Sequence, residues 1–163
     1  MYKLKTIKYH PLFLLLIIVL LALLLRFYHL SSLPNSVHRD ELINAYVGRY
    51  ILQNGKDLYG NPWPIFYFNK FGDYPPILPM YIMGIATFFF GISEFAMRFP
   101  AALMGSLTII PLYYIAKNIY KSNKIALLSA LFLAILPWHI VLSRFSAEGI
   151  LAVFFIPLVW RCC

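Results

Sequence analysis

The sequence predicts an all-α protein that crosses a membrane several times, and three observations lead to this class. The 163 residues are 61% hydrophobic and only 12% charged, whereas soluble domains are about half apolar and about a quarter charged. Uncharged runs long enough to cross a bilayer recur along the chain. Basic and acidic residues fall on opposite sides of those runs, so we expect no nucleic-acid partner despite the net charge of +8.

The two cysteines are the adjacent terminal pair Cys162 and Cys163. They close no loop that would stabilise a small secreted fold, which excludes a disulfide-stapled module. We interpret the pair as a tail feature or an acylation site rather than as a redox or metal pair.

A bilayer core of about 30 Å needs about 20 apolar residues in a helix. The segments that meet or approach this length are 9–28, 99–116, 125–143 and the beginning of a fourth at 150–160. The fourth stops too soon to span, so the chain looks truncated. The run 77–90 is also too short and contains Pro79 and Gly84, so we expect it to lie in the interface.

The first segment comes after a lysine-rich start and ends at Arg26, which we expect to snorkel to the far interface beside Phe27 and Tyr28. No convincing small-residue cleavage site comes after it. An uncleaved anchor is therefore favoured over a signal peptide.

Charge placement predicts the orientation. If 77–90 does not cross, the lysines before residue 9 and those in an inner loop, 117–124, share one side that has no acid. An outer segment, 29–98, and an outer turn, 144–149, then hold all six acids. By the positive-inside rule the amino terminus is cytoplasmic. We expect a multi-pass protein of the cell (inner) membrane whose active face is outside.

The outer segment should begin with a helix over 37–54, capped by Ser36 or Asp40 and ended by Gly55. Its apolar stripe consists of Ile43, Val47, Tyr50 and Ile51. Asp40 lies on the margin of this stripe and Glu41 is turned about 100° away, so an acid is presented at the membrane surface. The ordinary explanation of such acids is that they complement the helix dipole.

An aromatic stretch comes after this helix, with Trp63, Phe66, Tyr67 and Phe68. Aromatic residues at this depth usually anchor a protein in the interface. We therefore assign these four to the membrane surface rather than to a sugar-stacking platform.

Two pairs with i, i+4 spacing flank the later helices: Glu94 with Arg98, and Arg144 with Glu148. The predicted topology brings Asp40, Arg98, Arg144 and Glu148 to one face. Charges placed near a membrane in this way are candidates for a functional site.

Taken together, these pieces resemble the membrane glycosyltransferases that use a polyprenyl-phosphate sugar donor. These are the dolichyl-phosphate-mannose protein mannosyltransferases and their bacterial relatives, including lipid A aminoarabinose transferases. The similarity covers about residues 9–160 and rests on the order and spacing of the pieces. They are Asp40-Glu41, Gly72-Asp73-Tyr74-Pro75-Pro76, Gly91 to Glu94, Arg98-Phe99-Pro100-Ala101-Ala102-Leu103-Met104-Gly105, and Ser143-Arg144 with Glu148.

The resemblance implies a C-type glycosyltransferase (GT-C) fold, of which this chain would be the amino-terminal portion. It implies that Asp40 is the catalytic base, Glu41 its companion and Glu148 a second active-site acid. Relatives usually have a basic residue where Tyr74 stands, so Lys70 is the nearest substitute for a phosphate contact. The resemblance implies no certain cofactor. A divalent metal ion is a candidate, and Asp73 is its candidate ligand.

The implied reaction is inverting transfer of a sugar from a polyprenyl-phosphate donor to a hydroxyl of a protein, lipid or glycan. Asp40 would deprotonate the hydroxyl, and Arg98 or Arg144 would stabilise the leaving phosphate. For each arginine, anchoring to lipid headgroups is an equal alternative. Two other functions stay open: a lipid-phosphate-binding or transport subunit without chemistry, and a non-catalytic fragment of the transferase.

Overall fold

The structure is a computed structural model that describes residues 10–69, 72–145 and 148–162. In these ranges the regular secondary structure is helical and no strand occurs, which confirms the all-α prediction. The helices are α1 (Pro11–Phe27), α2 (Arg39–Asn54), α3 (Leu78–Phe90), α4 (Glu94–Leu107), α5 (Ile109–Tyr120), α6 (Asn123–Ile135), α7 (Pro137–Arg144) and α8 (Glu148–Cys162).

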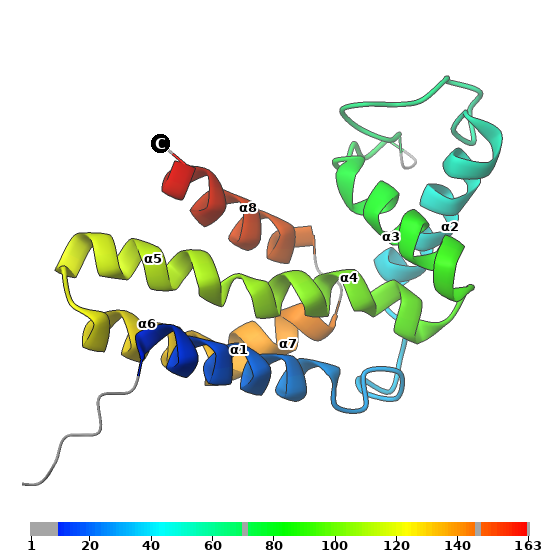
Figure 1. The fold of residues 1–163 in the computed structure, drawn as a ribbon. Coiled ribbons are helices and arrows are strands. Elements are labelled where there is room, and N and C mark those ends of the chain that lie inside the picture. The colour runs from blue at the N-terminus through cyan, green and yellow to red at the C-terminus, as the bar shows by residue number, and fades with distance from the viewer. Residues whose placement is uncertain (1–9, 70–71, 146–147, 163) are drawn as a thin grey trace, which may run out of the picture.

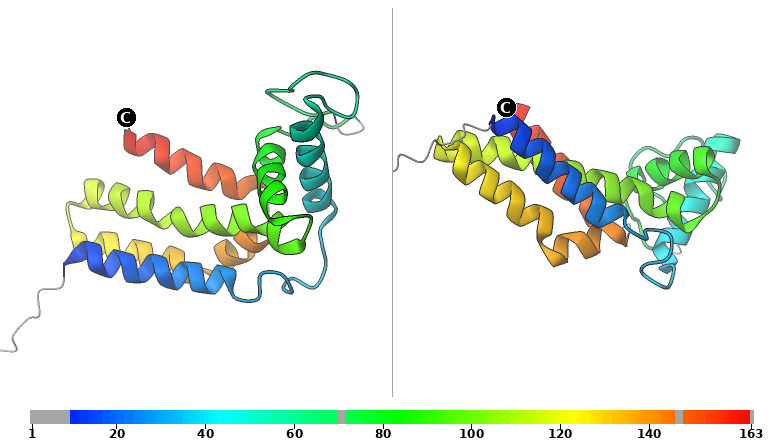
Figure 2. Two further views of the ribbon diagram at one scale, coloured as in Figure 1. Left: turned by 45° about the vertical axis from the view of Figure 1, so that its right-hand side comes forward. Right: turned by 60° about the horizontal axis from the view of Figure 1, so that its bottom comes forward.

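The helices form two parts with different directions (Figure 1). Helices α1 and α4 to α8 form a bundle in which α1, α4, α5 and α6 run along a common axis, and we refer to them as the bundle. Helices α2 and α3 lie side by side across one end of it, and we refer to them as the crossing pair. The other views show the same crosswise arrangement (Figure 2).

The core of the bundle depends on small residues of α6. Ala126, Ala130 and Ala134 are fully buried and recur every four residues, so they form one face against α1 and α5. Val19 of α1 and Tyr113 of α5 pack on this face. Small side chains let apolar helices approach closely, which is how helices associate in membranes.

Length and composition allow one helix in the described ranges to cross a membrane, the continuous run α4–α5 over Glu94–Tyr120 with 27 residues. It includes the predicted segment 99–116. Helices α6 and α7 count as a second span if the bent pair is taken together. Three other apolar helices, Pro11–Phe27, Leu78–Phe90 and Gly149–Trp160, are shorter than a full span.

The predicted helix over 125–143 is bent rather than straight. Helices α6 and α7 meet at 54°, because Leu136 has an extended backbone (φ −62°, ψ 114°) directly before Pro137. A proline disfavours the helical conformation of the residue before it and has no N–H to continue the helix.

In the crossing pair, the two helices touch at glycines. A Cβ atom on Gly48 of α2 would overlap the backbone of Met80, and one on Gly84 of α3 would meet the backbone of Gly48. This close approach buries Val47, Ile51, Ile77, Met80 and, from the connecting loop, Phe68. The assignment of Phe68 to the membrane surface is therefore wrong, whereas Trp63, Phe66 and Tyr67 are exposed.

Candidate functional site

The candidate site is built around the amino terminus of α2. His38 is the N-cap: its Nδ1 accepts from the backbone N–H of Asp40 at 3.3 Å, and its own N–H donates to Glu41 Oε2 at 3.1 Å. These two bonds satisfy donors that the first turn of a helix leaves unpaired. The cap is thus His38, not Ser36 or Asp40 as the sequence suggested.

The two acids of this turn have opposite environments. The side chain of Glu41 is 1% exposed and that of Asp40 is 48% exposed. The predicted place of Asp40, nearer the buried stripe than Glu41, is wrong because the buried face of α2 runs through Glu41, Ala45, Gly48 and Ile51. This is the face where Gly48 contacts α3. The buried face is thus wider than the apolar stripe, since it includes Val47 and Ile51 of the stripe and also Glu41, Ala45 and Gly48.

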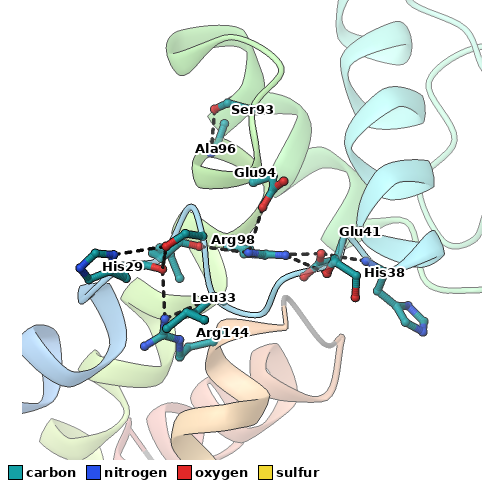
Figure 3. A network of polar contacts seen from close by, with 12 residues as sticks. His29, Leu33, His38, Glu41, Ser93, Glu94, Ala96, Arg98 and Arg144 are labelled. Atoms are coloured by element: carbon teal, nitrogen blue, oxygen red, sulfur yellow. Dashed lines mark hydrogen bonds and ion pairs between the residues drawn. The ribbon is translucent and has the colours of Figure 1, made fainter.

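Glu41 faces a guanidinium that is itself fully buried (Figure 3). Arg98 of α4 lies between two carboxylates: its Nη1 is 3.3 Å from Glu94 Oε2 and its Nε is 3.6 Å from Glu41 Oε2. It also donates to the carbonyl oxygens of Leu30 at 3.1 Å and Ser36 at 3.0 Å. Arg98 therefore joins α2, α4 and the segment after α1.

Burial raises the pKa of the Glu41 carboxyl, and the hydrogen bond from the His38 N–H and the charge of Arg98 oppose this rise. Desolvation disfavours the charged form of a buried acid. Within the described ranges Glu41 Oε1 is buried without a hydrogen-bond partner, which is consistent with this penalty. Glu41 is thus an acid held in a protein-enclosed environment.

The second predicted arginine, Arg144 at the end of α7, is half-buried and binds the same segment. Its Nη1 donates to the carbonyl of Leu25 at 3.2 Å, and its Nη2 donates to those of His29 at 3.2 Å and Leu33 at 3.1 Å. Figure 3 shows Arg144 near His29 and Leu33, away from Glu41. Both arginines thus fix the backbone between α1 and α2.

The fold brings some predicted site residues together and separates others. Asp40, Glu41, Arg98 and Arg144 lie at the end of the bundle that the crossing pair covers. Helix α8 begins at Glu148 and packs on α4, but the side chain of Glu148 lies outside the described part, as does Lys70.

Asp73 belongs to the loop 55–76, which joins the far ends of α2 and α3. A 16-residue helix is about 24 Å long, and this length separates that loop from Asp40. The Oδ1 of Asp73 accepts from the N–H of Tyr74 at 2.9 Å. In the part of the chain that the structure describes, no group of three or more His, Cys, Asp or Glu side chains is arranged to hold a metal ion.

A third buried arginine was not predicted as part of any site. Arg26 is fully buried in the bundle, so the expectation that it snorkels to a surface is wrong. It contacts His139 and Ser143 of α7. Two signals in the sequence point to it: a charge at the end of a long apolar run, and the Leu136-Pro137 step that bends the facing helix.

Comparison with known proteins gives a family for this fold. Residues 16–162 match the family model of the dolichyl-phosphate-mannose-protein mannosyltransferases. No curated protein and no solved structure matches the chain. The matched range spans nearly the whole sequence and includes both the crossing pair and the bundle, so the resemblance that the sequence motifs suggested is confirmed. The chain belongs to the dolichyl-phosphate-mannose-protein mannosyltransferase family.

Proposed function

We propose that this protein transfers mannose from a polyprenyl-phosphate donor to an acceptor hydroxyl, with Asp40 as the general base. The family is one of glycosyltransferases that use a lipid-linked sugar. The choice of Asp40 as the base depends on one observation, which is the difference in exposure between the two acids in the first turn of α2. Glu41 is enclosed beside Arg98, whereas Asp40 exposes 48% of its side chain.

Asp40 is also the more suitable base on chemical grounds. A general base must come within hydrogen-bond reach of the proton that it abstracts. An acceptor hydroxyl can approach Asp40 from outside, but it could reach Glu41 only if the contacts around Arg98 opened. Glu41 then serves as the companion acid that anchors the first turn of α2 through His38 and Arg98.

In the proposed step, the carboxylate of Asp40 accepts the proton of the acceptor hydroxyl. The hydroxyl oxygen forms a bond to the anomeric carbon of the sugar while the bond from that carbon to the donor phosphate oxygen breaks. The electron pair of that bond leaves with the polyprenyl phosphate. Attack from the face opposite the leaving group inverts the configuration of the anomeric carbon.

The leaving phosphate needs a cation, and we propose Arg144 rather than Arg98. Arg98 is fully buried and engaged with two carboxylates and two carbonyls. Arg144 is half-buried at the end of α7, next to the start of α8, and its contacts with three carbonyls leave two of its five N–H donors for a phosphate. Glu148 at the start of α8 is the proposed second acid. Arginine suits this role because its N–H groups match two phosphate oxygens at once.

We propose the topology that charge placement predicts, with the amino terminus inside and the acids outside. The loop between α5 and α6 lies at the end of the bundle opposite the crossing pair (Figure 1), and Lys117, Lys121 and Lys124 are in or beside this loop. Because α2 and α3 cross the bundle axis, they suit a position along the membrane surface. The apolar α3 lies between α2 and the bundle, on the side where lipid would be.

The experiment compares Asp40→Asn and Asp40→Glu with the control Arg39→Gln in the natural protein. Arg39 is an exposed neighbour in the same turn, and its variant also changes the net charge by one. Transfer of radiolabelled mannose from polyprenyl-phosphate mannose should fall about 10²- to 10⁴-fold in Asp40→Asn, and Arg39→Gln should keep full activity. Undiminished transfer by Asp40→Asn would remove the proposed base.

The donor lipid also separates this function from its main rival. If the unchanged protein binds polyprenyl-phosphate mannose but never turns it over with peptide, lipid or glycan acceptors, a lipid-phosphate-binding subunit is the better description. Turnover that depends on Asp40 excludes that rival.

A further inference from the structure

The bend between α6 and α7 leaves backbone acceptors without their usual partners. In a continuous helix the carbonyl of Leu133 would accept from residue 137. That residue is Pro137, which has no N–H. Helix α6 also ends at Ile135, so the carbonyl of Ala134 belongs to its last turn. Buried carbonyls without a partner are costly, so a donor from elsewhere is needed.

Arg26 supplies that donor from α1. Its guanidinium is fully buried, and each of its three nitrogens donates to the surrounding helices. The acceptors are the carbonyls of Ala22 (3.2 Å), Ala134 (3.1 Å) and Leu133 (3.3 Å), His139 Nδ1 (2.7 Å) and Ser143 Oγ (3.4 Å). A guanidinium has five N–H donors, and these acceptors number five.

The contact with His139 shows which form of that ring fits. Nη2 of Arg26 can only donate, so Nδ1 of His139 must accept and its proton must sit on Nε2. The ring is then neutral. All five partners of Arg26 in the described part of the chain are therefore uncharged groups, and none is a carboxylate.

The charge of Arg26 is instead stabilised by two helix ends. Arg26 lies in the last turn of α1, and it binds the last carbonyls of α6. The carboxyl ends of helices carry partial negative charge, which favours a cation in the last turn. The guanidinium thus links α1, α6 and α7 at one point.

The direction of α7 matters for the proposed site because both proposed site residues of this region lie at or just beyond its end. α7 ends at Arg144, which donates to the carbonyl of Leu25 in the last turn of α1, and α8 begins at Glu148. Both α7 and α8 pack on α4, which provides Arg98. A change in the bend would therefore move Arg144 relative to the turn that holds Asp40.

We propose that Arg26 is a positioning residue of the transferase, which fixes the α6–α7 bend and thereby the place of Arg144. This inference rests on the proposed function. Arg26 itself is enclosed by protein and touches no substrate. Its effect on position can be separated from its effect on stability, because Pro137 and Arg26 both act on the carbonyl of Leu133.

The test combines Arg26→Met with Pro137→Ala in the natural protein. Pro137→Ala restores the N–H that the carbonyl of Leu133 lacks, so the double variant should recover the thermal stability lost in Arg26→Met. It should not recover transfer, because the helix is then straight. Arg26→Met should lower kcat at least tenfold, and Arg26→Lys, which keeps the charge but not the fork of donors, should lower it to an intermediate value.

Spin labels report the bend without reference to activity. Labels replacing the exposed Ile125 and Val141 span it, with Cys162 and Cys163 changed to Ser. A straight helix would set them about 24 Å apart, and the distance in the unchanged protein should be shorter and narrowly distributed. Arg26→Met should broaden the distribution of distances between these two labels, and the double variant should increase the mean distance. A control pair at Ile119 and Leu128 does not span the bend and should stay constant.

Three results would overturn the proposal. The first is an unchanged label distance in Arg26→Met, and the second is normal kcat in that variant. The third is recovery of transfer by the double variant, which would make Arg26 a contributor to stability alone. If Arg26→Met does not fold, Arg26→Lys and the double variant decide the same questions. Absence of transfer by the unchanged protein would overturn the proposed function, while the labels would still decide whether Arg26 holds the bend.

Discussion

The bundle buries Arg26 against carbonyl oxygens, whereas the junction with the crossing pair buries Arg98 against carboxylates as well. In the bundle the partners are three carbonyl oxygens, the hydroxyl of Ser143 and the ring of His139, and none of them is a carboxylate. At the junction one partner is Glu41, whose pKa is raised by burial. The cation of the bundle thus links helices without an acid beside it, whereas the cation of the junction lies between two acids.

The largest expected effect comes from removing the buried cation of the junction. Arg98→Met leaves Glu41 buried without its ion-pair partner and should cost about 3–5 kcal/mol of unfolding free energy. Thermal unfolding in detergent measures this. The control is Glu94→Gln, since Glu94 is the 42% exposed partner of the same guanidinium and should cost at most about 1 kcal/mol. Equal losses in both variants would contradict the importance of burial.

A smaller loss is expected where the crossing helices touch. Gly48→Ala places a methyl group on the backbone of Met80, and overpacking of this kind costs about 1–3 kcal/mol. Gly149→Ala in α8 is the control, because its added Cβ would have nothing within 4 Å. That variant should gain up to about 1 kcal/mol from helix propensity. If both variants gained stability, the close contact between α2 and α3 would be wrong.

The step from the crossing pair into the bundle depends on a cap. Ser93 Oγ accepts from the N–H of Ala96 at 3.2 Å at the start of α4. Ser93→Ala should therefore cost about 1 kcal/mol, and Ser93→Asp should restore most of it. Chemical denaturation measures both. A loss that Asp does not restore would point to packing rather than capping.

The mildest change is Glu41→Gln, which keeps an acceptor for the His38 N–H. Because the folded-state pKa of Glu41 is raised, its contribution to stability is fully present below the unfolded pKa of about 4.3 and is lost as pH rises through the folded-state value. The unfolding free energy of the unchanged protein relative to this variant should thus fall as pH increases above about 4. A flat difference would mean that Glu41 is not desolvated.

Sequence reasoning predicted the helical class, the family and the helix at 37–54, because long apolar runs, ordered motifs and the stop at Gly55 are signals local to the chain. The apolar stripe of α2 correctly included Val47 and Ile51, but it missed the burial of Glu41, because the contact of Gly48 with α3 and the ion pair with Arg98 are tertiary events. Arg26 was taken for a surface anchor because length alone does not reveal that Pro137 bends the facing helix. Each segment has its own signal, but nothing in the sequence pairs two signals that are more than a hundred residues apart.

The three arginines have one feature in common. Each donates hydrogen bonds to backbone carbonyl oxygens in the stretch from Ala22 to Ser36. Every residue type offers the same backbone carbonyl oxygen as an acceptor, whatever its side chain. Many side chains of this stretch can therefore be substituted without loss of the hydrogen bonds that attach its backbone to the bundle. Among relatives, the three arginines should be conserved, whereas the residues whose carbonyl oxygens they bind should vary.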